Sequence, residues 1–317
     1  MNHRFAAFVG AAAAAVAAVS LAGQAPSRTF DSRRDLQGIW TNASVTPLER
    51  PAELAGKEFF TEAEAAAYEK QARERNDADR RDSNAEADLA TGYNDLFWER
   101  GRKVVSTRRT SLVVDPRDGR IPPLTADAQK QAAARAEARR LRPADGPEDR
   151  SLADRCIVRG TSGPPMLPAG YSNNYQIVQT PEFVAIVVEM IHETRLIPLE
   201  ARPHLAGKIR HVLGDPRGRW EDQTLVVDTT NFTDKTNFRG SGENLRVTER
   251  FTRIDKDTLL YRFTVDDPQS FTRPWSGEIP MKKIDGPIFE YACHEGNYSM
   301  ANILSAARHE ERVVHEP

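Results

Sequence analysis

Near the C-terminus, three side chains that can do chemistry stand next to one another: Cys293, His294 and Glu295. They end an apolar run that begins at Ile288 and also contains Glu290. Residues four apart on a strand project to the same face, so Glu290 and His294 are expected on one wall of a sheet. A carboxylate beside an imidazole can take up and return a proton, which is the minimum requirement for lyase or isomerase chemistry.

Two further residues complete the set of catalytic candidates. His192 lies in a second strand-like run, and a histidine that points into a barrel can act as a general base near neutral pH. Asp228 follows an apolar run and supplies another carboxylate. The predicted catalytic residues are therefore His192, His294, Glu290 and Asp228. Each histidine has the alternative of a hydrogen-bonded position in the core, and Glu290 has that of a salt bridge to an arginine.

Ligand-binding residues are expected where arginine and aromatic side chains gather in the C-terminal half. Arg239 is predicted to bind a ligand carboxylate or phosphate, because a guanidinium group matches either anion with two parallel hydrogen bonds. Asn231, Tyr291 and Trp275 lie among aromatic and polar residues. Such mixtures line pockets for carbohydrates and aromatic ligands, and they also occur in ordinary cores.

The sequence offers no motif for a cofactor or a dedicated metal centre. His294 and Glu295 begin like the helix motif of zinc proteases, but Tyr298 stands where that motif has its second histidine. A phosphate-binding loop, a dinucleotide loop and a nucleophile elbow are also missing from the sequence. We therefore expect no cofactor and no metal. A metal site built from His192, His294 and Glu295 is a weaker alternative.

The chain has two cysteines, Cys156 and Cys293. In an oxidising compartment an even pair predicts a disulfide, with one possible connectivity. Because it would close a long loop, this bridge is expected to contribute about 4 kcal/mol in the loop-entropy model. Two buried free thiols are the alternative.

The first residues predict export. A short basic start is followed by the apolar, alanine-rich run Phe5–Ala22 and by small residues at positions 23 and 25. We expect residues 1–25 to be a signal peptide cleaved after Ala25, with an uncleaved anchor as the weaker alternative. The 44 Lys and Arg against 46 Asp and Glu argue against nucleic acid and anionic membranes as partners. A periplasmic or secreted protein is expected, with a small-molecule ligand and no membrane span after cleavage.

The pattern of elements predicts a mainly β fold. Two helices are expected within residues 26–150, over Ala63–Ala85 and Ala126–Leu141, the first opened by a capping pattern of Thr61 and Glu64. The expected strands are Gly38–Thr41, Thr110–Val114, Tyr175–Gln179, Phe183–Met190, His192–Leu199, Trp220–Glu221, Thr224–Thr229, Leu245–Ile254, Thr258–Val265, Trp275–Lys282 and Ile288–His294. Strands joined by short turns predict an antiparallel up-and-down barrel, lipocalin-like, over residues 151–317, with a ligand in its interior. The segment 26–150 is expected to pack against it, and a β-sandwich fits almost as well.

Four segments have a distinctive sequence: RTSLVVDPRDGRIPPLT (Arg109–Thr125), RGRWEDQTLVVDTTNFTDKTNFRGSGENL (Arg217–Leu245), RFTRIDKDTLLYRFTVDDPQSFTRPW (Arg250–Trp275) and FEYACHEGNY (Phe289–Tyr298). Together they resemble a family of uncharacterised exported bacterial proteins. The resemblance implies a bacterial periplasmic setting. It implies no reaction, cofactor or catalytic residue.

Two functions are compatible with these observations. One is a cofactor-independent lyase, isomerase or hydrolase that acts on a small organic or sugar-derived molecule in the barrel mouth. The other is a non-catalytic binding or structural protein that uses the same pocket. A histidine and a carboxylate within hydrogen-bond reach would favour the enzyme, and an apolar cavity would favour the carrier. The sequence does not indicate an oligomeric state.

Overall fold

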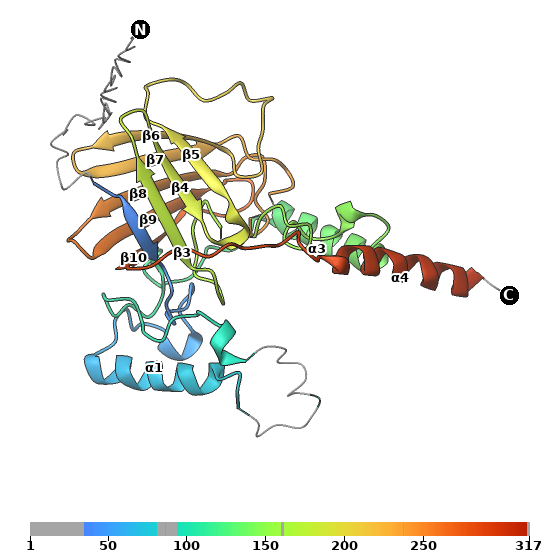
Figure 1. The fold of residues 1–317 in the computed structure, drawn as a ribbon, viewed down its shortest axis with the longest axis horizontal. Helices are drawn as coiled ribbons and strands as arrows, with labels where there is room; N and C mark the ends of the chain where they lie inside the picture. The colour runs from blue at the N-terminus through green and yellow to red at the C-terminus, as the bar shows by residue number, and fades with distance from the viewer. Residues whose placement is uncertain (1–34, 81–85, 87–93, 160–161, 237, 316–317) are drawn as a thin grey trace, which may run out of the picture.

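The structure is a computed structural model that describes residues 35–80, 86, 94–159, 162–236 and 238–315. The expected signal peptide, residues 1–25, lies outside this range. The described residues form a mainly β fold around one antiparallel sheet of ten strands, with a few helices at its margins (Figure 1).

The strands confirm the predicted antiparallel pattern with shifts of a few residues. They are β1 (Gly38–Thr41), β2 (Val113–Asp115), β3 (Asn174–Gln179), β4 (Phe183–Val188), β5 (Thr194–Pro198), β6 (Asp215–Glu221), β7 (Thr224–Thr230), β8 (Arg246–Arg253), β9 (Thr258–Asp266) and β10 (Trp275–Ile284). Their order in the sheet is β5-β4-β3-β1-β10-β9-β8-β7-β6, and β2 also pairs with β10.

The short strand β1 joins two meanders into one sheet. β3 to β5 form the first meander and β6 to β10 the second, each made of strands adjacent in sequence. β1 pairs with β3 on one side and with β10 on the other. The segment before residue 150 therefore does more than pack against the sheet, because it supplies β1 and β2.

The sheet curves until its two outer strands approach each other, but it does not close. A Cβ built on Gly218 of β6 would lie 2.8 Å from Ile197 Cγ2 of β5. In the described residues, no strand pairing joins β5 to β6. The closed barrel that the sequence favoured is therefore not confirmed, because the hydrogen-bonded ladder ends at these two edges.

The inward face of the sheet is filled with side chains. The largest fully buried residues include Trp40, Tyr175, Tyr261, Phe251 and Phe263, which come from β1, β3, β8 and β9. They belong to one continuous hydrophobic core. Met166, from the loop before β3, is also fully buried there, and its backbone N–H donates to the Tyr261 hydroxyl at 2.9 Å. The expected ligand-holding interior is thus occupied by the protein itself.

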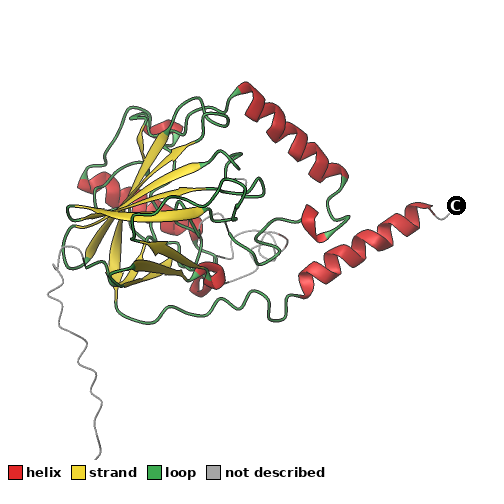
Figure 2. Cartoon of the chain, turned by 90° about the horizontal axis from the view of Figure 1, so that it is seen from above, coloured by secondary structure: helices red, strands yellow, loops and turns green. Residues whose placement is uncertain are grey.

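Helices lie outside the sheet. They are the α-helices α1 (Glu62–Asn76), α3 (Ala126–Leu141) and α4 (Tyr298–His315) and the 3₁₀ turns η1 (Ala52–Leu54), η2 (Asp95–Phe97), η3 (Pro147–Asp149) and η4 (Met190–His192). Thr61 and Glu64 form the predicted capping box at the start of α1. In Figure 1, α1 lies below the sheet, and α3 and α4 lie to its right. In Figure 2, α4 ends at the mark C and points away from the sheet.

The last predicted strand, Ile288–His294, is wrong. These residues form an extended arm with no strand pairing in the described chain, and α4 follows them. The reason is that β10 has no free edge for a hairpin partner: β9 occupies one side, and β1 and β2 occupy the other.

No described helix combines the length and the apolar character needed to cross a membrane.

Candidate functional site

The structure does not bring the four predicted catalytic residues together. Glu290 and His294 are exposed on the C-terminal arm, where the expected strand parity does not apply. His192 is exposed at the end of η4, in the connection between β4 and β5, where Ile191 and His192 adopt positive φ angles that do not occur in a regular strand. The prediction that Glu290 and His294 share one wall of a sheet is therefore wrong.

Asp228 has a structural partner on the outer face of the sheet. It lies on β7, forms an ion pair with Arg219 of β6, and accepts a 2.8 Å hydrogen bond from the Thr248 hydroxyl of β8. These contacts link three neighbouring strands. Neither contact involves the arm that carries Glu290.

His192 contacts one predicted ligand-binding residue, Tyr291. The His192 Nδ1 donates to the Tyr291 carbonyl at 2.9 Å. A carbonyl only accepts, so the proton of the neutral ring sits on Nδ1 and the Nε2 lone pair is left available. The Tyr291 ring stacks on Tyr171 with a centroid separation of 6.2 Å, and burial raises the pKa of its hydroxyl.

The other predicted ligand-binding residues lie apart from one another. Trp275 is completely buried and packs edge-on against Phe263 and Phe271 in the core. The Asn231 side-chain amide donates to the Leu205 carbonyl at 2.9 Å and so holds a loop. Arg239, in contrast, lines a cleft of substantial size.

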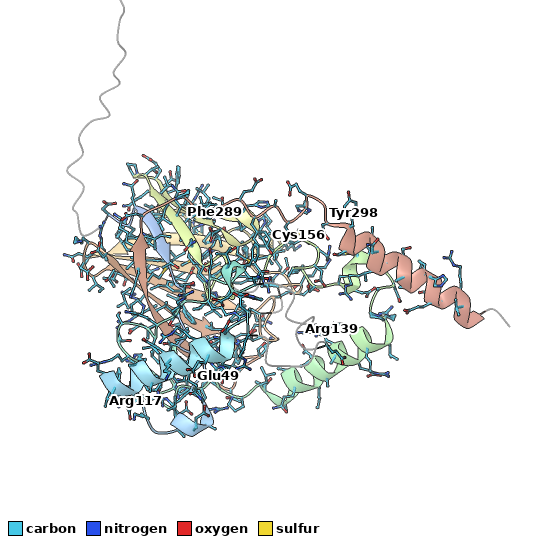
Figure 3. All side chains as sticks on the ribbon, turned by 60° about the horizontal axis from the view of Figure 1, so that its bottom comes forward. Glu49, Arg117, Arg139, Cys156, Phe289 and Tyr298 are labelled. Carbon is cyan, nitrogen blue, oxygen red and sulfur yellow. A yellow bond between two sulfur atoms is a disulfide. The ribbon has the colours of Figure 1, made fainter. Side chains whose placement is uncertain are left out.

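The predicted disulfide between Cys156 and Cys293 is confirmed. The two Cα atoms are 5.7 Å apart, and the bridge spans 137 residues of sequence. It connects the loop before β3 to the C-terminal arm, so neither end lies in a strand. Figure 3 shows Cys156 on the side of the molecule from which α4 emerges.

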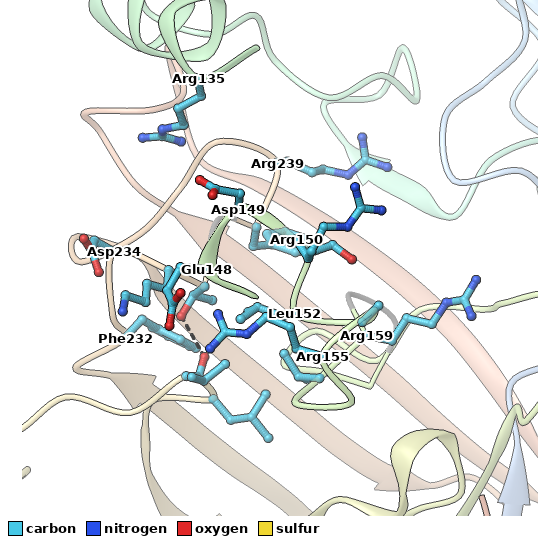
Figure 4. A pocket seen from close by; sticks show the side chains of 18 of the residues that line it. Arg135, Glu148, Asp149, Arg150, Leu152, Arg155, Arg159, Phe232, Asp234 and Arg239 are labelled. Atoms are coloured by element: carbon cyan, nitrogen blue, oxygen red, sulfur yellow. Dashed lines mark hydrogen bonds between the residues drawn. The ribbon is translucent and has the colours of Figure 1, made fainter. Parts of the chain in front are cut away.

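Arg239 belongs to a cleft of about 710 Å³ between α3 and one end of the sheet (Figure 4). We call it the arginine cleft. Four parts of the chain form its walls. They are α3, the segment 148–159, the segment 163–167, and the loops at 212–213, 232–236 and 238–239.

The α3 wall follows from helical spacing. Arg135 and Arg139 are four residues apart and lie on one face of the helix, and Arg142 follows at its C-cap. Thr125 caps the helix by accepting a hydrogen bond from the Ala128 N–H at 3.1 Å, which fixes where that face begins. The helix is otherwise rich in alanine and almost fully exposed, so this face is available to the cleft.

Positive charge dominates the lining. Eight basic side chains face three carboxylates: Arg135, Arg139, Arg142, Arg150, Arg155, Arg159, Lys235 and Arg239 against Glu148, Asp149 and Asp234. A second cleft, of about 520 Å³ beside α1, is balanced. Its charged residues are Arg73, Arg100 and Arg102 against Glu74, Asp77, Asp95 and Glu99. The excess is therefore a property of the arginine cleft and not of the protein surface in general.

Some of these cations are not neutralised by neighbouring acids. Arg150 pairs with Asp154 at 3.2 Å, and Arg142 approaches Asp145 at 3.9 Å. The guanidinium groups of Arg155 and Arg239, by contrast, make no ion pair or hydrogen bond with any residue that the structure describes. Their guanidinium groups come from two different walls, and Figure 4 shows both at the cleft.

Apolar side chains form much of the rest of the surface. The residues concerned are Leu152, Val158, Pro164, Leu167, Val212, Leu213, Phe232 and Phe238. Phe232 and Leu167 are buried, so they also belong to the hydrophobic core. A ligand in this cleft would thus contact the core of the protein with its apolar part and the arginines with its charged part.

Sequence reasoning identified Arg239 but missed the other arginines. The signal was present: Arg135 and Arg139 share a face of the predicted helix, Arg142 follows directly after its end, and three further arginines lie at positions 150, 155 and 159. No group of three His, Cys, Asp or Glu side chains that could hold a metal occurs among the described residues. The alternative metal site of His192, His294 and Glu295 therefore has no geometric support.

The arginine cleft is thus defined by its own geometry and charge. Comparison of the chain with protein-family models, with curated proteins and with solved structures gave no match.

Proposed function

We propose that this protein binds a small organic anion with an apolar body in the arginine cleft. The observation that carries the proposal is the excess of eight basic side chains over three carboxylates around one cleft of a chain whose total charge is nearly balanced. Like charges gathered around a concave surface repel one another. Such an arrangement is stabilised by an anion that enters it.

The chemistry of the walls indicates what kind of anion would fit. Guanidinium groups bind carboxylates, sulfonates and phosphates through paired hydrogen bonds, and Arg155 and Arg239 have their donors uncommitted in the described structure. The apolar surface around Phe232 and Leu152 favours a hydrophobic body. The volume of about 710 Å³ falls within the range of roughly 300–1,000 Å³ that small-molecule sites occupy.

The setting of this function is proposed to be the periplasm or the exterior of the cell. The leader-like N-terminus and the Cys156–Cys293 disulfide support that location, because disulfides persist in oxidising compartments. The curved sheet, with β5 and β6 close to each other, supports a barrel-like, lipocalin-like architecture whose ligand lies at one end instead of inside.

Acid–base catalysis is the second candidate function. It is favoured by the contact of His192 Nδ1 with the Tyr291 carbonyl, because that contact leaves Nε2 able to accept a proton from a substrate. His192 does not line the arginine cleft. Replacement of His192 by alanine would abolish turnover in this second case and would leave anion binding in the cleft unchanged.

A pair of matched ligands tests the proposal. 2-Naphthoate and 2-naphthalenemethanol share an aromatic body and differ in the negative charge, and each is titrated into the protein by calorimetry. We expect the carboxylate to bind at least about tenfold more tightly, because only it engages the guanidinium groups. Equal affinity for both compounds, or no binding of either, would contradict the proposal.

A further inference from the structure

We propose that the C-terminal segment, residues 285–315, positions the arginine cleft, with Cys293 and Arg308 as the groups that hold one wall in place. This inference rests on the proposed function of the cleft as an anion site. It assigns a binding role to a disulfide and a helix that lie outside the sheet.

The segment 143–157, which contains most of the cleft wall at 148–159, has little structure of its own. Its only regular element is the single turn η3, Pro147–Asp149. The rest consists of local turns, such as the bond from the Ile157 N–H to the Leu152 carbonyl at 2.9 Å. This short segment supplies Arg150 and Arg155 to the cleft. A loop of this kind needs contacts from elsewhere to fix where its side chains point.

One end of the wall is bound covalently to the C-terminal segment. Cys156 directly follows Arg155 and is bonded to Cys293. The Asn297 amide adds hydrogen bonds to the Asp154 carbonyl at 3.5 Å and to the Cys156 sulphur at 3.4 Å. The backbone on either side of Arg155 is therefore fixed by the arm that leads into α4.

The other end of the wall is held by α4. The Arg308 guanidinium donates to the Asp145 carbonyl at 2.7 Å and to the Ala144 carbonyl at 3.2 Å, and it also pairs with Glu311 on its own helix. Ala144 is buried beneath these contacts. A planar guanidinium group can serve two carbonyls and a carboxylate at once, which an ammonium group does less well.

These contacts have no equivalent from other parts of the fold. Among the described residues, every disulfide, hydrogen bond or ion pair that reaches 143–157 from a distant part of the sequence comes from Cys293, Asn297 or Arg308. Loss of these contacts leaves the wall free to take many conformations. The affinity for an anion then falls, because only a fraction of the molecules present Arg150 and Arg155 together toward the cleft.

The opposite wall provides an internal control. α3 is anchored through Thr125 to the loop between β9 and β10: the Thr125 N–H donates to the Ser270 carbonyl at 3.0 Å, and its hydroxyl donates to the Gln269 carbonyl at 2.6 Å. Farther along, Arg135 donates to the Gly240 carbonyl at 3.4 Å. None of these contacts involves the C-terminal segment. Opening the disulfide should therefore loosen one wall and leave the other in place.

Hydrogen–deuterium exchange tests the inference without any ligand. The double variant Cys156→Ser/Cys293→Ser and the single variant Arg308→Ala are compared with the unaltered protein. We expect faster exchange in residues 143–157 in both variants and unchanged exchange in β8 and β9. Arg308→Lys should restore part of the protection. Arg312→Ala, on the same helix but without a contact to the wall in the described structure, should have no effect. Unchanged exchange in 143–157 would overturn the inference.

Titration with 2-naphthoate adds the functional readout. We expect the affinity to fall about tenfold in the double cysteine variant and several-fold in Arg308→Ala, at a temperature where both remain folded by circular dichroism. If the unaltered protein binds 2-naphthoate and the variants bind it equally well, the positioning role is refuted and the proposed anion site is not. Unaltered protein that does not bind would refute the proposed function, while the exchange experiment still decides whether the segment holds the wall.

Discussion

Arg195 of β5 and Glu249 of β8 form an ion pair at the centre of the molecule, with 2% and 0% of their side chains exposed. One guanidinium nitrogen lies 3.0 Å from a carboxylate oxygen, and the Tyr261 hydroxyl donates to that same oxygen at 2.9 Å. Five strands separate β5 from β8 along the sheet. The pair can form only because the sheet curls until distant strands face each other. Its presence is therefore direct evidence of that curvature.

Removal of one member of this pair should destabilise the fold strongly. Glu249→Ala leaves the Arg195 charge buried without its partner, and we expect a loss of about 3–5 kcal/mol in the free energy of unfolding, measured by urea denaturation. The double variant Arg195→Met/Glu249→Leu replaces both charges with apolar groups and should recover most of that loss. A change below about 1 kcal/mol for Glu249→Ala would mean that the pair is not buried as described.

A glycine in β10 makes room for an aromatic ring. Gly277 lies opposite Phe263 of β9, and a Cβ at that position would come within 2.3 Å of the ring. Gly277→Ala should therefore cost about 1–3 kcal/mol, because the buried ring must move. Gly207→Ala is the matched control, since nothing lies within 4 Å of its Cβ position. Equal midpoints of thermal unfolding for the two variants would contradict the assigned register.

Asp215 should contribute to stability in a pH-dependent way. Burial alone would raise the pKa of its carboxyl, but hydrogen bonds from the Leu205 N–H, His204 and Arg217 outweigh burial and lower the pKa. A carboxyl whose pKa is lower in the folded state stabilises the protein above its unfolded pKa of about 3.9, and this contribution is lost as the pH falls through the folded pKa.

Asp215→Asn is the variant that isolates this contribution. It should lower the unfolding free energy at pH 7 by about 2 kcal/mol, and the difference from the unaltered protein should shrink below about pH 4. The measurement is urea unfolding at several pH values. Asp285→Asn, at an exposed site, should follow the unaltered protein throughout. A difference that stays constant or grows on acidification would refute the assigned role.

Anion binding in the arginine cleft should weaken with salt. Charges at an open cleft are screened as the Debye length shortens from about 10 Å at 0.1 M to about 3 Å at 1 M ionic strength. We expect the affinity for 2-naphthoate to fall about tenfold over this range. The affinity for the neutral 2-naphthalenemethanol should not fall. Calorimetric titrations of both compounds at several salt concentrations test this expectation. An affinity for 2-naphthoate that does not change with salt would exclude an electrostatic site.

Much of the sheet could be predicted because its information is local. Hairpins such as β8–β9 combine alternating apolar residues with the polar turn around residues 255–257, and α3 begins and ends at the predicted residues. The arm at 288–294 has the same apolar and aromatic composition as a strand. Whether it can pair depends on a free edge of β10, and that edge is taken by β1 from the other end of the chain. Local pattern does not carry this information.

The candidate site was less predictable than the fold. Histidine and carboxylate residues were predicted to be catalytic because their side chains can transfer protons, yet His294 and Glu290 lie on an exposed arm. The sequence also predicted a closed barrel with a ligand inside. The interior of the sheet is instead filled by side chains such as Met166 and the Arg195–Glu249 ion pair. The arginines on α3 and in the following loop converge only in three dimensions, because the two segments lie on opposite walls of one cleft.

The most direct test of the account is calorimetric titration of 2-naphthoate into Arg155→Ala/Arg239→Ala. Each arginine contributes charge-assisted hydrogen bonds worth about 1.5–3 kcal/mol, so the double variant should bind at least roughly a hundredfold more weakly than the unaltered protein. Arg246→Ala, at an exposed position on β8 outside the cleft, should bind like the unaltered protein. A double variant whose affinity stays within about twofold of the unaltered protein would show that the arginine cleft is not the anion site.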